Sequence, residues 1–240
     1  MRVARVVSSL VLTAHGSTDP RSASTARAIA DGVRQLRPSL DVRIAFCEKS
    51  FPNLRAVLPI VPIGSVVVPL LLADAYHARA DIPAIIAESG TDTHQASVLG
   101  EDDRLIEVLR QRVEQSAISR LDREVGVLVA AVGSSRQGAN ARTESVARKL
   151  TLTTRWTVTT AFATGPRPGL DEAADLLRRG GADRLVIAPW FLAPGKIIDR
   201  VAAFAGTQGI EMAAPLGAHR QVAAVVLDRF DQARAARFAA

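Results

Sequence analysis

The chain has 240 residues, a net charge of +6 and a hydrophobic content of 48%, which is enough for one large or two small domains. Its single cysteine, Cys47, excludes an internal disulfide and a cysteine-based zinc or iron–sulfur site within one chain. The arginine-rich charge suits an anionic partner, but the sequence has no basic tract or stacking aromatic set for nucleic acid, and no apolar run long enough to span a membrane.

Apolar runs alternate with helical patterns along the first half of the chain. We expect strands near 9–14, 41–46, 65–72 and 95–99, and helices near 21–36, 52–60, 81–89 and 102–115. The third run is continuous and rich in β-branched residues, which is typical of a strand buried on both faces of a parallel sheet. The first run leads directly into a histidine motif without a convincing cleavage pattern, so we expect a cytoplasmic protein.

The second half repeats the first. Five short matches recur in the same order 116 to 120 positions later, for example HGS at 15–17 against VGS at 132–134. The repeat predicts strands near 126–132, 156–162, 184–191 and 210–214, and helices near 139–150, 168–180, 195–206 and 219–236. Strands that alternate with helices imply parallel sheets. We therefore expect an α/β fold of two tandem domains, 1–118 and 119–240, each with a parallel sheet of about four strands flanked by helices.

The repeat fails at titratable positions. His15, Glu48 and His77 follow the first three strands, and the second half has Val132, Thr164 and Ile197 in their places. Because the carboxyl ends of parallel strands meet at one edge, where ligands bind in open α/β sheets, we expect the three side chains to lie together. This pattern predicts one active half and one supporting half.

Two imidazoles and a carboxylate form a ligand set that suits Fe(II), Co(II), Ni(II) or Zn(II). They could bind the metal, or shuttle metal and protons. The other two histidines, His94 and His219, are weaker candidates because neither follows a strand. Phosphate-binding and nucleophile-elbow motifs are missing from the sequence, which disfavours nucleotide and hydrolase chemistry.

Three stretches resemble the CbiX/SirB family of sirohydrochlorin chelatases. They are HGSTDPR at 15–21, AFCEKSFPNL at 45–54 and VVVPLLLADAYHARADIP at 66–83. The resemblance covers the whole chain, since longer members of the family carry two such halves. It implies a lyase that inserts a divalent metal into sirohydrochlorin and releases two protons. Fe(II) would serve siroheme synthesis and Co(II) cobalamin synthesis, and both remain open.

The resemblance also implies roles for particular residues. His15 and His77 would handle the metal and, with Glu48, carry catalysis. We add Ser17, Arg21, Tyr76 and Arg79 as substrate-binding candidates because they flank the histidines, and an arginine can meet a tetrapyrrole carboxylate.

Partners follow from the same resemblance. We expect no tightly bound cofactor, with Fe2+ or Co2+ as a substrate, and a monomer that forms a pseudo-dimer within one chain. The alternatives are a non-catalytic tetrapyrrole or metal carrier, which a turnover assay distinguishes, and a periplasmic-type two-domain binding protein, for which the sequence has no evident export signal.

Overall fold

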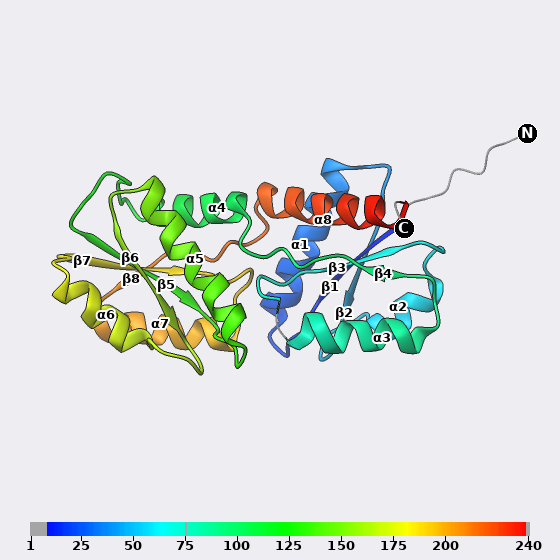
Figure 1. The fold of residues 1–240 in the computed structure, drawn as a ribbon, viewed down its shortest axis with the longest axis horizontal. Coiled ribbons are helices and arrows are strands. Elements are labelled where there is room, and N and C mark those ends of the chain that lie inside the picture. The colour runs from blue at the N-terminus through cyan, green and yellow to red at the C-terminus, as the bar shows by residue number, and fades with distance from the viewer. Residues whose placement is uncertain (1–8, 75, 239–240) are drawn as a thin grey trace, which may run out of the picture. The chain divides into compact units, whose positions relative to one another are not determined.

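A computed structural model describes residues 9–74 and 76–238 of the chain (Figure 1). It contains two four-stranded parallel sheets, each with helices on both faces, as the alternating pattern predicts. The chain divides into two compact units, one made of residues up to Gly100 with those from Ala218 onward, the other of Glu101 to Gly217.

The first unit is built on a sheet with strand order β2-β1-β3-β4. Its strands are β1 (Ser9–Ala14), β2 (Asp41–Phe46), β3 (Val66–Pro69) and β4 (His94–Gln95). Its helices are α1 (Pro20–Leu36), α2 (Leu54–Val57), α3 (Ile82–Ser89) and α8 (Arg220–Phe238). On the α2 and α3 side, Val11, Val67 and Ile85 belong to one buried apolar cluster. Burial of such side chains stabilises the unit by about 1.5–3 kcal/mol each.

The second unit repeats this plan with strand order β6-β5-β7-β8. Its strands are β5 (Val125–Ala131), β6 (Thr157–Phe162), β7 (Arg184–Pro189) and β8 (Glu211–Met212). Its helices are α4 (Asp103–Glu114), α5 (Gln137–Thr153), α6 (Leu170–Arg179) and α7 (Lys196–Gln208). Within the described part of the chain, none of the helices is both long and apolar enough to cross a bilayer.

The last helix of each sequence repeat belongs to the compact unit formed by the other repeat. The repeat places α4 in the first half, yet α4 packs with α5 and β7 of the second unit, and its apolar face, including Leu105 and Leu109, is fully buried. The repeat places α8 in the second half, yet α8 packs against α1 and β3 of the first unit. The compact units therefore do not coincide with 1–118 and 119–240, because each exchanges its final helix for that of the other half.

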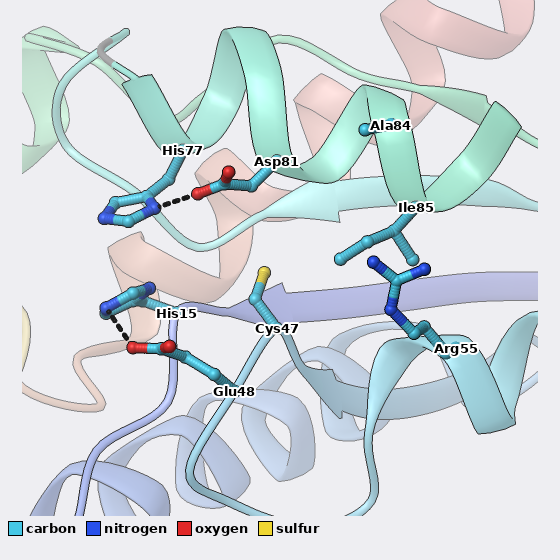
Figure 2. A pocket seen from close by; sticks show the side chains of 8 residues that line it. All are labelled: His15, Cys47, Glu48, Arg55, His77, Asp81, Ala84 and Ile85. Carbon is cyan, nitrogen blue, oxygen red and sulfur yellow. Dashed lines mark hydrogen bonds and ion pairs between the residues drawn. The ribbon is translucent and has the colours of Figure 1, made fainter. Parts of the chain in front are cut away.

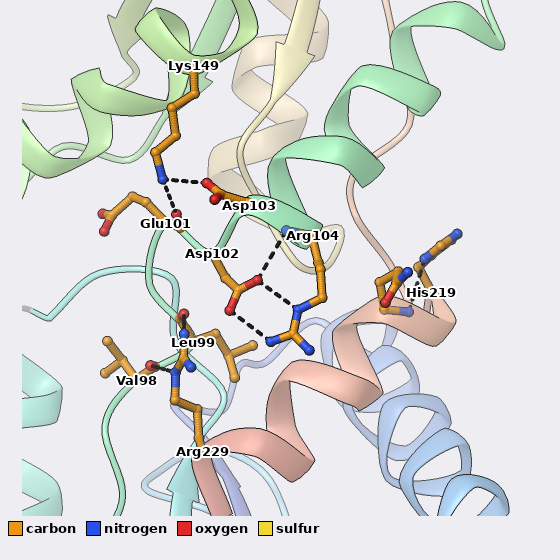
Figure 3. Close-up of polar contacts among 10 residues, drawn as sticks. Val98, Leu99, Glu101, Asp102, Asp103, Arg104, Lys149, His219 and Arg229 are labelled. Carbon is orange, nitrogen blue, oxygen red and sulfur yellow. Dashed lines mark hydrogen bonds and ion pairs between the residues drawn. The ribbon is translucent and has the colours of Figure 1, made fainter. Parts of the chain in front are cut away.

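Polar contacts fix both exchanged helices (Figure 3). Arg229 of α8 donates to the carbonyl oxygens of Val98 (3.0 Å) and Leu99 (2.9 Å) in the first unit. Lys149 of α5 donates to the Glu101 carbonyl at 3.1 Å and to Asp103 at 2.6 Å in the second unit. Hydrogen bonds therefore hold the main chain on both sides of the point, between Gly100 and Glu101, where it passes from the first unit to the second.

Register places the ends of three strands side by side in the first sheet. Ala14 of β1 pairs with Phe46 of β2, and Thr13 pairs with Pro69 of β3. The third strand is shorter than predicted because Pro69 ends it, although the amide of Leu70 still donates to the Thr13 carbonyl at 2.7 Å. The loops that follow β1, β2 and β3 consequently leave the sheet at one edge.

Candidate active site

The three titratable side chains predicted at this edge do lie together (Figure 2). His15 directly follows β1, Glu48 lies two residues beyond β2, and His77 begins a helical turn after β3. The ring centroids of His15 and His77 are 3.9 Å apart and their planes are tilted by 35°. Two imidazoles at this separation resist both being charged at once, since like charges repel strongly at short range.

Each imidazole has a carboxylate partner. His15 Nε2 lies 3.1 Å from Glu48 Oε1, and the ammonium of Lys49 lies 2.5 Å from the same oxygen. His77 Nδ1 lies 2.5 Å from Oδ2 of Asp81, one helical turn further along the chain. Figure 2 shows the Nε2 atoms of both rings on the side away from Cys47 and Arg55, with that of His15 turned to Glu48. Each ring is thus held by a carboxylate, His15 through Nε2 and His77 through Nδ1.

The backbone at Gly16 brings Glu48 close to His15. Gly16 has a φ of +95°, and a Cβ there would lie 1.7 Å from the carbonyl oxygen of Glu48. Glu48 donates its amide to the His15 carbonyl at 3.0 Å, which continues the β1–β2 ladder beyond the strands. Only glycine permits both the left-handed conformation and this close approach. Local chain geometry therefore positions the carboxylate beside the ring.

Burial and charge favour a neutral His15. Burial lowers the pKa of His15 below its ordinary value of 6.5, and the nearby His77 lowers it further. The hydrogen bond from Lys49 also lowers the pKa of Glu48, below 4.5, and for a carboxyl group a lowered pKa favours the charged form. Near neutral pH the edge therefore carries an ionised carboxylate beside an uncharged imidazole, a combination that can accept a proton or a cation.

A cavity of about 360 Å³ extends from the histidines between α3 and the β2–α2 connection. It is lined by His15, Cys47, Glu48, Arg55, His77, Asp81, Ala84 and Ile85. Burial raises the pKa of Cys47 to about 11, so in the free protein this thiol stays protonated near neutral pH and is a poor nucleophile. Arg55 forms an ion pair with Glu88 of α3.

The four substrate-binding candidates do not line this cavity. Tyr76 is 66% exposed and its ring stands edge-on to His77 at 6.2 Å. Arg21 is held by its neighbour Asp19, with a shortest contact of 2.6 Å, and Arg79 forms an ion pair with Asp74. Ser17 takes part in the turn before α1, where its hydroxyl accepts from the Asp19 amide at 3.0 Å.

The remaining histidines lie elsewhere. His94 pairs with Val66 at the first residue of β3, so it occupies the opposite edge of the sheet. His219 accepts a hydrogen bond at Nδ1 from the amide of Gln221 (3.2 Å) at the start of α8. Neither belongs to the cavity beside His15. No group of three potential metal ligands is found among the residues that the structure describes.

The segment around His77 differs from the prediction. The sequence indicates a polar turn followed by a helix from 81, whereas residues His77–Asp81 form a π-helical turn that runs into α3. The amide of Ile82 donates to the His77 carbonyl five residues earlier. Sequence reasoning also missed Asp81 as a partner of His77, although their spacing of four residues, which puts both on one helix face, was the available signal.

Comparisons with known proteins place this chain in a family. The CbiX family model matches residues 9–116 and 126–233, so the chain belongs to the CbiX family, with the domain present twice. The resemblance drawn from the three motifs is thereby confirmed.

Two curated relatives come from Priestia megaterium. The chain is 27% identical over 205 residues to a sirohydrochlorin cobaltochelatase, covering 80% of this chain and 67% of the relative. It is 25% identical over 200 residues to a sirohydrochlorin ferrochelatase, covering 78% of this chain and 74% of the relative. Among solved structures, SirB from Bacillus subtilis with Fe3+ superposes with a TM-score of 0.78 at 21% identity, over 94% of both chains.

Proposed function

We propose that this protein is a sirohydrochlorin chelatase that inserts Fe(II) or Co(II) into the macrocycle with release of two protons. The observation that carries the proposal is the pair of imidazoles 3.9 Å apart, with Glu48 beside them, at the carboxyl edge of the first sheet. Membership of the CbiX family and relatives that act on sirohydrochlorin with either metal support it.

Metal insertion at the carboxyl edge of the first sheet requires groups with free lone pairs and groups with negative charge. When the metal, here a substrate, enters the macrocycle, two pyrrole N–H protons must leave. A neutral imidazole is a suitable acceptor near pH 7, and His15 is kept neutral by burial and by His77. The ionised carboxylate of Glu48 attracts the incoming cation and balances the charge that a protonated His15 acquires.

We assign substrate binding to residues around the pair. Tyr76 offers an exposed ring beside His77, suited to packing on a flat macrocycle. Arg21 and Arg79, whose side chains are each about half exposed, would bind substrate carboxylates by exchanging their present carboxylate partners, Asp19 and Asp74. Ser17 lies in the turn between His15 and α1.

Turnover tests the proposal. Purified protein is mixed with excess sirohydrochlorin and with Co(II), or with Fe(II) under anaerobic conditions, and the change in absorption is followed. We expect many metal insertions per protein molecule at a rate well above the spontaneous reaction. A carrier would bind about one equivalent of ligand without accelerating insertion, and that result would contradict the proposal.

We also propose that the chain acts as a monomer, because both repeats of the family domain are already present in it. Light scattering after size exclusion should give a mass close to 25.5 kDa. A mass of twice that value would contradict this proposal.

A further inference from the structure

We propose that Asp81 is a positioning residue that fixes the tautomer and orientation of His77, so that Nε2 of His77 carries a free lone pair for the metal or for a pyrrole proton. The effect of Asp81 on metal insertion rests on the proposed function, whereas the tautomer of His77 is a property of the free protein. It adds a residue to the candidate site that the sequence motifs place only at a helix start.

The contact itself determines where the proton of His77 lies. Asp81 Oδ2 is 2.5 Å from His77 Nδ1, and an ionised carboxylate can only accept a hydrogen bond. Nδ1 of the neutral ring must therefore carry the hydrogen, which leaves the lone pair on Nε2. Figure 2 shows that this nitrogen points away from Asp81 and to the same side as Nε2 of His15. Ligation and proton acceptance both require that lone pair.

Asp81 contacts His77 instead of capping the N-terminus of α3. Asp81 occupies the N-cap position of α3, where an aspartate usually accepts hydrogen bonds from amides of the first turn. Its side chain makes no such capping bond here, and bonds back to His77 instead. An aspartate inside a helix is otherwise unfavourable, so the pairing with the ring accounts for its presence in continuous helical backbone.

The turn that carries both residues is anchored to the sheet. Residues His77–Asp81 form the π-helical turn, and such turns occur frequently at functional sites. Gln95 of β4 donates to the carbonyl of Ala78 at 2.7 Å, and the Ala78 side chain is buried. His77 and Asp81 thus lie on a helical turn that is hydrogen-bonded to the sheet. Such an anchored turn can keep the imidazole ring in one orientation.

The two imidazoles are held differently. His15 meets its carboxylate, Glu48, through Nε2, and its buried Nδ1 has no hydrogen-bond partner within the described structure. His77 meets Asp81 through Nδ1, and its Nε2 points away from Asp81. The lone pair available in the free protein is therefore that of His77, whereas Nε2 of His15 offers a lone pair only after its contact with Glu48 opens and its hydrogen moves to Nδ1.

Nitrogen NMR of histidine-labelled protein tests this assignment directly. Spectra are recorded well above the ordinary pKa of histidine, and the His77 signals are assigned by their loss in His77→Gln. We expect the Nδ1–H tautomer for wild-type His77, and a shift of population toward Nε2–H in Asp81→Ala and in the isosteric Asp81→Asn, which preserves the shape of the side chain if the alanine variant folds poorly. Asp31→Asn is the matched control, since Asp31 pairs with Arg34 on α1.

Kinetics then tests the consequence. In both Asp81 variants we expect kcat for metal insertion to fall about tenfold to a hundredfold, the usual cost of removing a carboxylate behind a histidine ligand, with an unchanged KM for the tetrapyrrole. An unchanged His77 tautomer in folded Asp81→Asn would overturn the inference. An unchanged kcat in that variant would overturn the catalytic role. If wild-type protein shows the Nδ1–H tautomer but no metal insertion, the proposed function fails while the assignment of Asp81 stands.

Discussion

After β1, the amide of Glu48 donates to the carbonyl of His15 at 3.0 Å; after β5, the amide of Thr164 donates to the carbonyl of Val132 at 2.9 Å. The glycines agree as well, since Gly16 has a φ of +95° and Gly133 a φ of +91°. The two carboxyl edges thus share their backbone, down to single hydrogen bonds, but the second has Val132, Thr164 and Ile197 where the first has His15, Glu48 and His77.

The comparison separates what builds an edge from what acts there. Close approach of the two loops is needed for the fold of either unit, so its geometry is present in both. The paired imidazoles and their carboxylates are present only in the first, so an edge with this backbone forms without them in the second unit. Changes at matched positions should accordingly affect activity in the first unit and stability in the second.

The largest expected effect is on the rate after loss of either imidazole. His15→Ala and His77→Ala should lower the rate of metal insertion by about two to four orders of magnitude, the range typical of general acid–base groups. The matched variants Val132→Ala and Ile197→Ala should keep the wild-type rate. Insertion assays on the four folded proteins check this. Wild-type rates in both histidine variants would refute the assignment of the chemistry to this edge.

Alanine at the two glycines should separate stability from chemistry. A Cβ at position 16 would lie 1.7 Å from the Glu48 carbonyl oxygen, and one at position 133 would lie 2.1 Å from that of Thr164. We expect Gly16→Ala and Gly133→Ala each to lower the free energy of unfolding by about 1–3 kcal/mol or more, from backbone strain alone. Urea titrations measure this loss, and activity per folded molecule should fall only in Gly16→Ala. Equal activity in both would show that the position of Glu48 is unimportant.

Glu48 and its counterpart give a smaller contrast. Glu48→Gln removes the charge that faces His15 and Lys49, so the rate should fall about tenfold to a hundredfold, as is usual when a partner of a catalytic histidine is lost. Thr164→Val removes a hydrogen bond from its hydroxyl to the Val132 carbonyl, which should cost about 0.5–1.5 kcal/mol of stability and leave the rate unchanged. Steady-state assays and thermal unfolding of both variants decide the matter.

The pH dependence of stability is the subtlest contrast. The pKa of His15 is lower in the folded protein than its ordinary value of 6.5, so the unfolded chain binds this proton more readily. Stability from this source is complete above pH 6.5 and is lost as the pH falls from 6.5 toward the folded-state pKa. His15→Gln should therefore flatten the decline in urea midpoint on the acid side of 6.5. His94 has a lowered pKa for the same main reason, burial, so His94→Gln should flatten part of the remaining decline. A decline unchanged in His15→Gln would contradict the buried, uncharged ring.

Much of the candidate site was predictable because strand ends in a parallel sheet are fixed by local pattern. The positions of β1, β2 and β3 put His15, Glu48 and His77 at one edge, and the structure brings them together. The predicted α/β fold with two four-stranded sheets is confirmed for the same reason.

What was missed depends on contacts between segments or on fine backbone geometry. The exchange of α4 and α8 reflects long-range packing, such as that of α8 on α1, which no local pattern encodes. In the π-helical turn at His77 the backbone amide bonds to the carbonyl five residues earlier, instead of four as in an α-helix. The helix propensities of the residues do not distinguish these two patterns. The existing partners of Arg21 and Arg79 likewise required side-chain positions.

The location of a bound metal tests the central claim most directly. Crystals of the wild-type protein soaked in Co(II), with diffraction recorded at the cobalt absorption edge, should show an anomalous peak within bonding distance of His15 or His77. The same map should show none beside Val132, Thr164 and Ile197, and the peak should vanish in His77→Ala crystals. A cobalt peak at the second edge, or one that survives the loss of His77 unchanged, would contradict the account.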